Sequence, residues 1–260
     1  MPPVLEARQV AKLFAKDNHR IVALESCDLV VKEGTFVALL GRSGCGKSTL
    51  LNLFAGLSRP SSGQILLRGA ALSGPCPGVG YLTQSDTLMP WRKLHRNIEL
   101  PLELRGVERA ERKRRSDQLI EMVGLKGHEG HYPRELSGGM RRRASLARML
   151  ISDPGLLLLD EPFGALDAQL RAEMQAELLR LWQGSGRSVV FVTHDIEEAL
   201  VLGDRVVVLG ERGQVRLDVA VPLERPRDLD DIRVDPDFVN MHRQLNRALK
   251  GGRDDVIPAT

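Results

Sequence analysis

Few folds are open to a chain that carries the run Gly41-Arg42-Ser43-Gly44-Cys45-Gly46-Lys47-Ser48-Thr49. Residues 36–40 directly before it are all apolar, which predicts a buried strand leading into a glycine-rich loop and then a helix. Backbone N–H groups of such a loop converge on phosphates, and the helix adds the positive end of its dipole. Lys47 supplies a charge and Ser48 can bind Mg²⁺. This phosphate loop therefore predicts a site for ATP or GTP; the simpler interpretation is a Gly-Ser turn with an incidental lysine.

An acidic pair, Asp160-Glu161, follows four consecutive leucines. Such an apolar run is typical of a strand in a parallel sheet that is covered on both faces. At the carboxyl end of the strand a carboxylate can hold Mg²⁺ through water, so Asp160 is a candidate metal ligand with Glu161 at the same edge. The alternative is an ordinary boundary between a strand and a turn, and Pro162 argues against it.

Gln84 and His194 also stand at the ends of predicted strands. Gln84 follows Tyr81-Leu82-Thr83, and His194 follows the run Ser188–Thr193. Each residue has a plain interpretation as well. A glutamine at a strand end is usually solvated, and a lone histidine there is more often a core residue or the neighbour of a helix cap.

Hydrophobic patterns predict the other elements. Further strands are expected at residues 4–7, 23–31, 64–68 and 80–83, with a polar loop at 16–20. Helical spacing of apolar residues covers 92–150 and recurs at Leu170, Met174, Leu178 and Leu181. A last helix is expected to start at Asp235 as N-cap with Pro236 behind it, and to bury Phe238, Met241, Leu245 and Leu249.

Charge and cysteine content exclude several classes of partner and site. The formal net charge is only +3 and is spread over the chain, and residues 108–115 mix Glu with Arg and Lys at helical spacing. A solvated helix face explains that run better than a nucleic-acid patch, so no nucleic-acid partner is expected. Cys27, Cys45 and Cys76 are odd in number and irregularly spaced, which favours a reducing compartment over disulfides or zinc.

No signal-peptide pattern precedes the first strand, and no apolar run approaches the roughly 20 residues of a membrane span. We therefore expect a cytoplasmic chain that meets a membrane only through another protein.

The segment Leu136-Ser137-Gly138-Gly139-Met140 completes a pattern. Together with the phosphate loop, Asp160-Glu161 and His194, it resembles the ATP-binding-cassette (ABC) ATPases in motif identity, order and spacing. The resemblance implies an α/β fold: a P-loop NTPase (RecA-like) core, an antiparallel β subdomain and an α-helical subdomain inserted at about residues 92–150. It implies an ATPase domain over 1–222 and a C-terminal extension over 223–260 with a short helix.

The resemblance also implies roles for single residues. Glu161 would polarise the attacking water as general base, Gln84 would sense Mg²⁺ and water, and His194 would contact the γ-phosphate. Phe14 matches the position whose ring stacks on adenine, where a core aromatic is an equal alternative because an amphipathic strand would need Phe anyway. Ala165-Leu166-Asp167 looks like the D-loop of this family.

In the resembling proteins Ser137, Gly138 and Gly139 would contact the nucleotide bound by another subunit. The resemblance thus implies two copies of this chain in head-to-tail arrangement, with two ATP molecules sandwiched between them. Met140 stands where glutamine is commoner, which leaves the Ser-Gly-Gly contact intact.

Four less specific sequence segments resemble the nitrate/sulfonate/taurine importer branch of the family. They are Leu88-Met89-Pro90-Trp91, Phe163–Ala168, Thr193–Ala199 and Asp235–Phe238. Membership implies a peripheral ATPase at the cytoplasmic face of the inner membrane, bound to an integral-membrane permease and served indirectly by a periplasmic or lipid-anchored solute-binding protein. Met89, Pro90 and Trp91 would help to form the socket for the permease. Taurine or an aliphatic sulfonate is the expected solute, with nitrate next.

Other functions stay open from the sequence alone. The chain could serve another solute, or an exporter, although exporter subunits commonly carry a fused membrane domain for which no apolar span is found. An ABC ATPase that works on DNA or ribosomes would carry a long coiled-coil insertion or a second cassette, and neither pattern is present in this sequence. A non-catalytic nucleotide-gated module would lack the base, whereas both Glu161 and His194 are in place.

Overall fold

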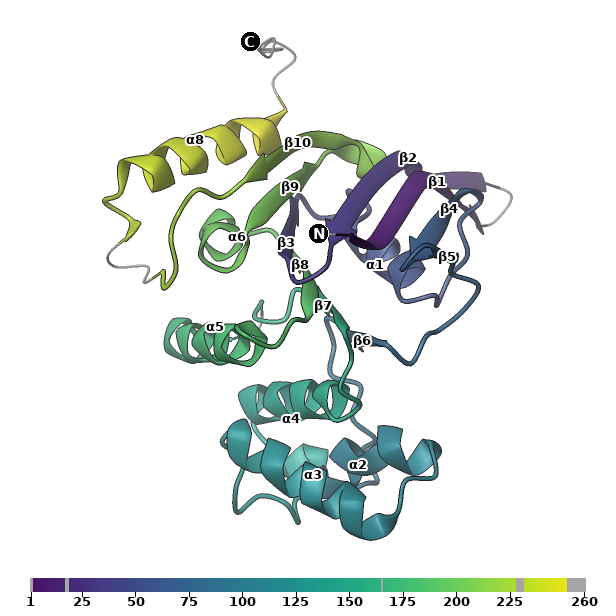
Figure 1. The fold of residues 1–260 in the computed structure, drawn as a ribbon, viewed down its shortest axis with the longest axis vertical. Helices are drawn as coiled ribbons and strands as arrows, with labels where there is room; N and C mark the ends of the chain where they lie inside the picture. The colour runs from purple at the N-terminus through teal and green to yellow at the C-terminus, as the bar shows by residue number, and fades with distance from the viewer. Residues whose placement is uncertain (1, 17–18, 165, 228–231, 252–260) are drawn as a thin grey trace. The chain divides into compact units, whose positions relative to one another are not determined.

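The computed structural model describes residues 2–16, 19–164, 166–227 and 232–251 (Figure 1). The chain divides into two compact units. Residues 1–74 and 190–260 form the first unit, and residues 75–189 form the second. In the described ranges, none of the helices combines the length and the hydrophobicity needed to cross a membrane.

The first unit contains an antiparallel sheet of strands β1 (Pro3–Lys16), β2 (His19–Lys32), β4 (Ser62–Leu67) and β5 (Ala70–Ala71). Their order is β2-β1-β4-β5, and Ala7 of the central strand pairs with Leu29 on one side and with Ile65 on the other. The predicted loop at 16–20 is shorter than expected, because the β1–β2 ladder runs on to the pair Lys16–His19. Asp17 and Asn18 lie outside the described residues.

A second set of strands in this unit has the order β10-β9-β3-β8. These are β3 (Phe36–Gly41), β8 (Ser188–Thr193), β9 (Arg205–Leu209) and β10 (Val215–Ala220). Strand β3 pairs in parallel with β9, and all of its residues are buried, as the apolar run predicted. The ring of Phe36 packs 5.9 Å from that of Phe191 between centroids.

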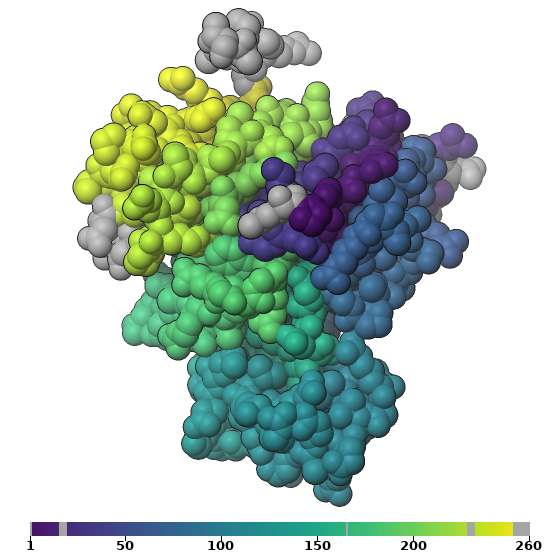
Figure 2. All heavy atoms as spheres, in the orientation of Figure 1, coloured from purple at the N-terminus to yellow at the C-terminus, as the bar shows by residue number. Residues whose placement is uncertain are grey.

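Helix α8 (Pro236–Lys250) begins as predicted, because the Asp235 carboxylate accepts hydrogen bonds from the N–H groups of Asp237 and Phe238. Its apolar side packs on the core of the first unit, while its outer side is part of the surface seen in Figure 2. Phe238, Met241 and Leu245 are buried there against α6 (Ile196–Leu202) and β9.

The chain before α8 is fastened by a buried arginine. Arg227 donates hydrogen bonds to the carbonyls of Leu200, Gly203 and Leu223. Two of these lie at the C-terminal end of α6, where carbonyl groups lack partners within the helix. Helix α6 starts two residues after His194. The bonds of Arg227 therefore stabilise the helix that directly follows this predicted site residue.

The second unit is mainly helical. Its helices are α2 (Leu94–Leu104), α3 (Arg109–Met122), α4 (Gly138–Leu150) and α5 (Ala168–Trp182), with the short η1 (Pro133–Glu135) between α3 and α4. Leu94, Ile98, Ile120 and Ala147 lie in one core shared by α2, α3 and α4. The helices predicted between residues 92 and 150 are therefore confirmed, whereas the domain boundary at residue 222 stays a prediction.

Two parallel strands complete this unit, β6 (Val79–Leu82) and β7 (Leu156–Asp160). All five residues of β7 are buried. Because the strands are parallel and Leu82 pairs with Leu159, the residues that follow them emerge at the same edge. Gln84 and Asp160-Glu161 come from that edge.

The charged run at 108–115 forms the start of α3 and is solvated, as predicted. Glu111 pairs with Arg114 at 2.7 Å and with Arg115 at 2.6 Å. Hydrogen bonds from these two guanidinium groups lower the pKa of Glu111 to about 2. Part of the positive charge of this face is thus paired within one helix.

Candidate active site

The predicted phosphate loop joins β3 to α1 (Lys47–Phe54) in the first unit. Two of its glycines have positive φ, 80° at Gly44 and 109° at Gly46. At Gly46 a Cβ atom would lie 2.6 Å from Leu24 Cδ2 and 2.8 Å from the carbonyl oxygen of Ala23. The loop thus follows a path that L side chains rarely adopt, close against β2.

The helix that leaves this loop starts without a side-chain cap. Its first turn has no acidic residue. The start of a helix carries the positive end of its dipole. Lys47 is buried, and its ammonium donates to the carbonyls of Gly41 at 2.7 Å and of Arg42 at 3.0 Å. This arrangement suits a group with several negative oxygens.

The other residues of the loop divide by exposure. Arg42, Ser43, Gly44 and Ser48 are exposed, and Thr49 is half-buried. Cys45 and Gly41 are buried; a Cβ at Gly41 would lie 2.7 Å from the Cys45 sulfur. The carbonyl of Cys45 accepts a hydrogen bond from Gly213, which fixes the turn from behind.

His194 lies in the same unit, directly after β8. Its side chain is exposed, so the interpretation as a core histidine is wrong. The next residue, Asp195, caps α6 by accepting from the N–H groups of Glu197 and Glu198. His194 therefore is the neighbour of a helix cap, and its role toward a phosphate stays a prediction.

Phe14 is also in the first unit, on β1 opposite Ile21. Its side chain is 44% exposed, so the alternative of a core aromatic is wrong. The ammonium of Lys12 lies 5.1 Å from the centroid of the ring. An exposed ring beside a cation offers one face for stacking, and stacking on adenine stays a prediction.

The second unit places Gln84 and Asp160-Glu161 at the shared edge of β6 and β7. Asp160 is buried, Glu161 is half-buried and Gln84 is exposed. Burial and the nearby Asp160 charge both raise the pKa of Tyr81, which keeps that phenol neutral. Glu161 has a positive φ of 42°, a conformation that costs a non-glycine residue about 1–3 kcal/mol. This left-handed backbone at Glu161 turns the chain away from the extended conformation of β7.

Ser137 caps α4 in this unit. Its hydroxyl accepts a hydrogen bond from the N–H of Met140 at 3.2 Å, and the first turn of α4 holds no acid. Ser137 and Gly138 are exposed, and a Cβ at Gly139 would lie 2.3 Å from Leu170 Cδ2. The role as helix cap accounts for a serine at position 137. The contact of Ser137 with a nucleotide bound by a second copy stays a prediction.

The predicted D-loop is described in part. Ala165 lies outside the described residues, Leu166 is buried, and Asp167 caps α5 by accepting from the N–H of Leu170 at 3.0 Å.

The candidate metal ligands Ser48, Gln84 and Asp160 offer a hydroxyl, an amide oxygen and a carboxylate. Hard oxygen donors of this kind are those that Mg²⁺ prefers. Ser48 belongs to the first compact unit, and Gln84 and Asp160 belong to the second. Among the described residues no cluster of three or more His, Cys, Asp or Glu side chains could hold a metal. The chemistry of the three donors fits Mg²⁺, and their meeting around one ion stays a prediction.

The loop of residues 88–93 contains both a buried and an exposed apolar side chain. Leu88 is buried in the helical core, whereas Trp91 is 71% exposed. Asn97 is fully buried, and its side chain binds backbone groups of residues 88–93, which we call the Trp91 loop. Its amide oxygen accepts from the N–H of Met89 at 2.6 Å, and its amide nitrogen donates to the carbonyls of Met89 and Arg92. The exposed indole is thus presented by a fixed loop.

A hollow of about 440 Å³ adjoins the indole. It is lined by Trp91, Arg92, Lys93, Arg96 and Glu103. Arg92 and Glu103 are paired at 2.9 Å, which leaves the lining basic on balance.

Arg142 lies outside the motifs from which the site residues were predicted. A usable signal was present, because positions 142, 146 and 150 follow one helical stripe whose other members, Leu146 and Leu150, are apolar. An arginine on a buried stripe indicates a specific partner.

Comparisons with known proteins agree with one another. A family model described as ABC transporter matches residues 24–164. An uncharacterised ABC transporter ATP-binding protein of Methanocaldococcus jannaschii is 44% identical over 97% of this chain and 92% of its own length. A taurine import ATP-binding protein of Burkholderia pseudomallei is 40% identical over 96% of this chain and 98% of its own length.

Two further likenesses concern nitrate import and the fold. A nitrate import ATP-binding protein of Synechococcus elongatus is 43% identical over 89% of this chain, which spans only 36% of that relative. A solved dimeric ATP-binding cassette in a post-hydrolysis state, bound to ADP and Pi, matches with a TM-score of 0.77 at 30% identity. That match covers 85% of this chain and 100% of the other.

Proposed function

Because the chain belongs to the ABC transporter family, we propose that it is the ATP-hydrolysing subunit of an importer for a small anionic or zwitterionic solute. One observation carries the proposal: 40% identity to a taurine import ATP-binding protein over 98% of that relative's length. Taurine or an aliphatic sulfonate is the proposed solute. Nitrate comes next, since the nitrate import relative is matched over a smaller share of its own length.

ATP with Mg²⁺ is the proposed reactant. Residues 41–49 are proposed to hold the phosphates through backbone N–H groups and Lys47, with Phe14 against the adenine. Mg²⁺ neutralises phosphate charge when it is bound, and Ser48, Gln84 and Asp160 are its proposed ligands. Glu161 is proposed to accept the proton of the attacking water, and His194 to stabilise the charge that develops on the γ-phosphate. The oxygen donors of these ligands and the acid-free first turn of α1 support this assignment.

Two copies of the chain are proposed to act together. The exposed Ser137 and Gly138, at the acid-free start of α4, are suited to a phosphate held by another copy. The dimeric state named for the similar solved cassette supports the same arrangement.

A membrane-embedded permease is the proposed partner of the Trp91 loop, and the chain would thereby sit peripherally at the cytoplasmic face of the inner membrane. An exposed tryptophan next to a hollow is a favourable anchor site, because buried Trp residues dominate the energy of many interfaces. A solute-binding protein would act on the permease and not on this chain.

Uptake of labelled solute tests the function. Cells that lack this chain should lose uptake of taurine or of an alkanesulfonate, and the wild-type chain should restore it. Loss of nitrate uptake alone would select the second solute. Normal uptake of taurine, alkanesulfonates and nitrate in those cells would contradict the proposed function.

Trp91→Ala should separate partner binding from nucleotide binding. Losing a central tryptophan costs an interface about 2 kcal/mol or more, or roughly 30-fold in Kd for the permease. ATP affinity of the isolated chain should stay unchanged, because Trp91 belongs to a separate loop. Leu104→Ala is the matched control, since Leu104 is an apolar residue of the same unit that is 80% exposed. Equal permease binding by both variants would remove Trp91 from the docking surface.

A further inference from the structure

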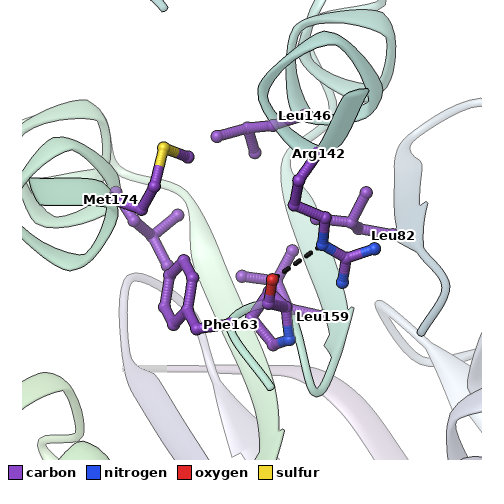
Figure 3. A pocket seen from close by; sticks show the side chains of 8 residues that line it. Leu82, Arg142, Leu146, Leu159, Phe163 and Met174 are labelled. Atoms are coloured by element: carbon purple, nitrogen blue, oxygen red, sulfur yellow. Dashed lines mark hydrogen bonds between the residues drawn. The ribbon is translucent and has the colours of Figure 1, made fainter. Parts of the chain in front are cut away.

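Arg142 of α4 brings together three segments of the second unit, and Figure 3 draws its hydrogen bond to the carbonyl of Pro162. Its Nε donates to the carbonyl of Pro162 at 2.7 Å, and Nη2 donates to that of Asp160 at 3.4 Å. Its Nη1 donates to the carbonyls of Thr83 at 2.5 Å and Gln84 at 3.3 Å. One side chain therefore joins α4 to the residues that follow β6 and to those that follow β7.

A cation in this position is not required by packing. Arg142 is only 7% exposed, and burial lowers its pKa to about 10 although the charges of Asp160 and Asp86 oppose the shift. An apolar side chain of similar length, such as methionine, would fill the space without burying a charge. The distinguishing property of arginine here is its fork of donors, which can bond several carbonyls at fixed angles.

Two other arginines of α4 bond residues that follow Gln84. Arg141 Nε donates to the Asp86 carboxylate at 2.8 Å, and Arg148 Nη1 donates to the Thr87 carbonyl at 2.8 Å. Both bonds fasten the segment after Gln84 to the helix. Of these three arginines, only Arg142 also donates to residues 160–162 in the hydrogen bonds between described residues.

The space beside Arg142 does not suit a ligand. A cavity of about 10 Å³ lies there. It is lined by Leu82, Arg142, Leu146, Leu159, Pro162, Phe163, Met174 and Leu178. That volume holds about one water molecule, so the arginine serves a closed, packed junction.

We propose that Arg142 is a positioning residue of ATP hydrolysis: it holds Gln84 and the Asp160–Pro162 segment at fixed places on the helix that Ser137 caps. The inference rests on the proposed function. Glu161 lies between two residues whose carbonyls Arg142 binds, so the strained turn at Glu161 is tied on both sides. A movement of α4 toward a second copy would carry Gln84 and Glu161 with it.

The experiment compares Arg142→Met and Arg142→Lys with Arg143→Met in the purified full chain. Arg143 is a matched control, because its guanidinium donates to the carbonyls of Val123 and Gly124 at 3.1 and 3.2 Å, at the end of α3. Arg142→Met removes every donor, and Arg142→Lys keeps the charge but not the fork. The measurements are kcat, KM for ATP, Kd for ATP, the Mg²⁺ dependence of the rate and the melting temperature.

Both Arg142 variants should lose about 10- to 100-fold in kcat, since small misplacements of reacting groups cost rates of this order. KM and Kd for ATP should change by less than about threefold, because the phosphate loop is unaltered. The Mg²⁺ concentration at half-maximal rate should rise, since Gln84 and Asp160 are proposed ligands. The melting temperature should fall no further than in Arg143→Met.

Other results overturn the inference. It is wrong if kcat of the Arg142 variants equals that of Arg143→Met, or if Kd for ATP rises in proportion to the loss of rate. It is equally wrong if both Arg142 variants fail to fold while Arg143→Met folds, because Arg142 would then be structural. Absence of hydrolysis by the wild-type chain would instead refute the proposed function.

Discussion

Glu161→Gln should lower kcat for ATP hydrolysis by about 10²- to 10⁴-fold, the usual contribution of a general base, and leave ATP binding intact. The amide has nearly the shape of the carboxylate but cannot accept a proton from water. Because the backbone at Glu161 keeps its φ of 42° with either side chain, the melting temperature should not change. ATP that is bound but not cleaved should hold two copies together, so the variant should elute as a dimer with ATP.

The control for this substitution is Glu173→Gln. Glu173 is exposed on α5 and accepts a hydrogen bond from Gln169, so the same change of charge there should leave kcat unaltered. Near-normal hydrolysis by Glu161→Gln would show that the base is another residue. Loss of ATP binding in that variant would contradict the separation of binding from chemistry.

Gly46→Ala should abolish ATP binding at concentrations that saturate the wild-type chain. A Cβ at this position meets the backbone oxygen of Ala23 at 2.8 Å, and φ is 109°. Backbone strain and overpacking cost about 1–3 kcal/mol each, so the free energy of unfolding should fall by about 2–6 kcal/mol. The loop can relieve the clash only by moving away from β2, which displaces its N–H groups.

Gly44→Ala provides the matched comparison within the same loop. Gly44 has a φ of 80°, but a Cβ there would have nothing within 4 Å. Only the cost of the left-handed backbone applies, about 1–2 kcal/mol. Urea unfolding and ATP titration of the two variants measure the difference. Equal losses in both would mean that contact with β2 does not shape the loop.

Much of the fold could be predicted from the sequence because its patterns are local. The five apolar residues before Gly41 and the four leucines before Asp160 are buried strands, as predicted. The cap at Asp235 sets the start of α8 where the sequence placed it. The likeness to solved cassettes confirms the predicted α/β fold of a P-loop NTPase.

Features that depend on distant partners were not predictable. The β1–β2 ladder extends beyond its apolar residues because each polar residue at its end finds a backbone partner on the other strand. Phe14 was left between two interpretations, because an alternating strand pattern does not say which face meets the core. The run Leu88–Trp91 does not reveal by its pattern that Leu88 packs in the helical core while Trp91 is exposed.

The site residues show the same difference between local motifs and distant partners. Positions such as Lys47 and Glu161 stand inside motifs whose spacing carries the chemistry. Arg142 acts through carbonyls that lie 18 to 59 residues away in the chain, and no local pattern encodes such bonds. Its place on an apolar helical stripe was the one available signal.

Crosslinking between two populations of the chain tests the proposed shared site. One population carries Ser43→Cys and the other Gly138→Cys, both in a Glu161→Gln, Cys76→Ser background. Both positions are exposed, and a Cβ atom at Gly138 would meet nothing closer than 3.9 Å. Lys126→Cys paired with Ser43→Cys is the control, since Lys126 is exposed on the helical unit.

A short bismaleimide should link Ser43→Cys to Gly138→Cys of the other population when ATP and Mg²⁺ are present. The link should be weak without nucleotide, and the Lys126→Cys control should not respond to ATP. A yield between positions 43 and 138 that is the same with and without ATP would contradict the claim that two copies close over the nucleotide.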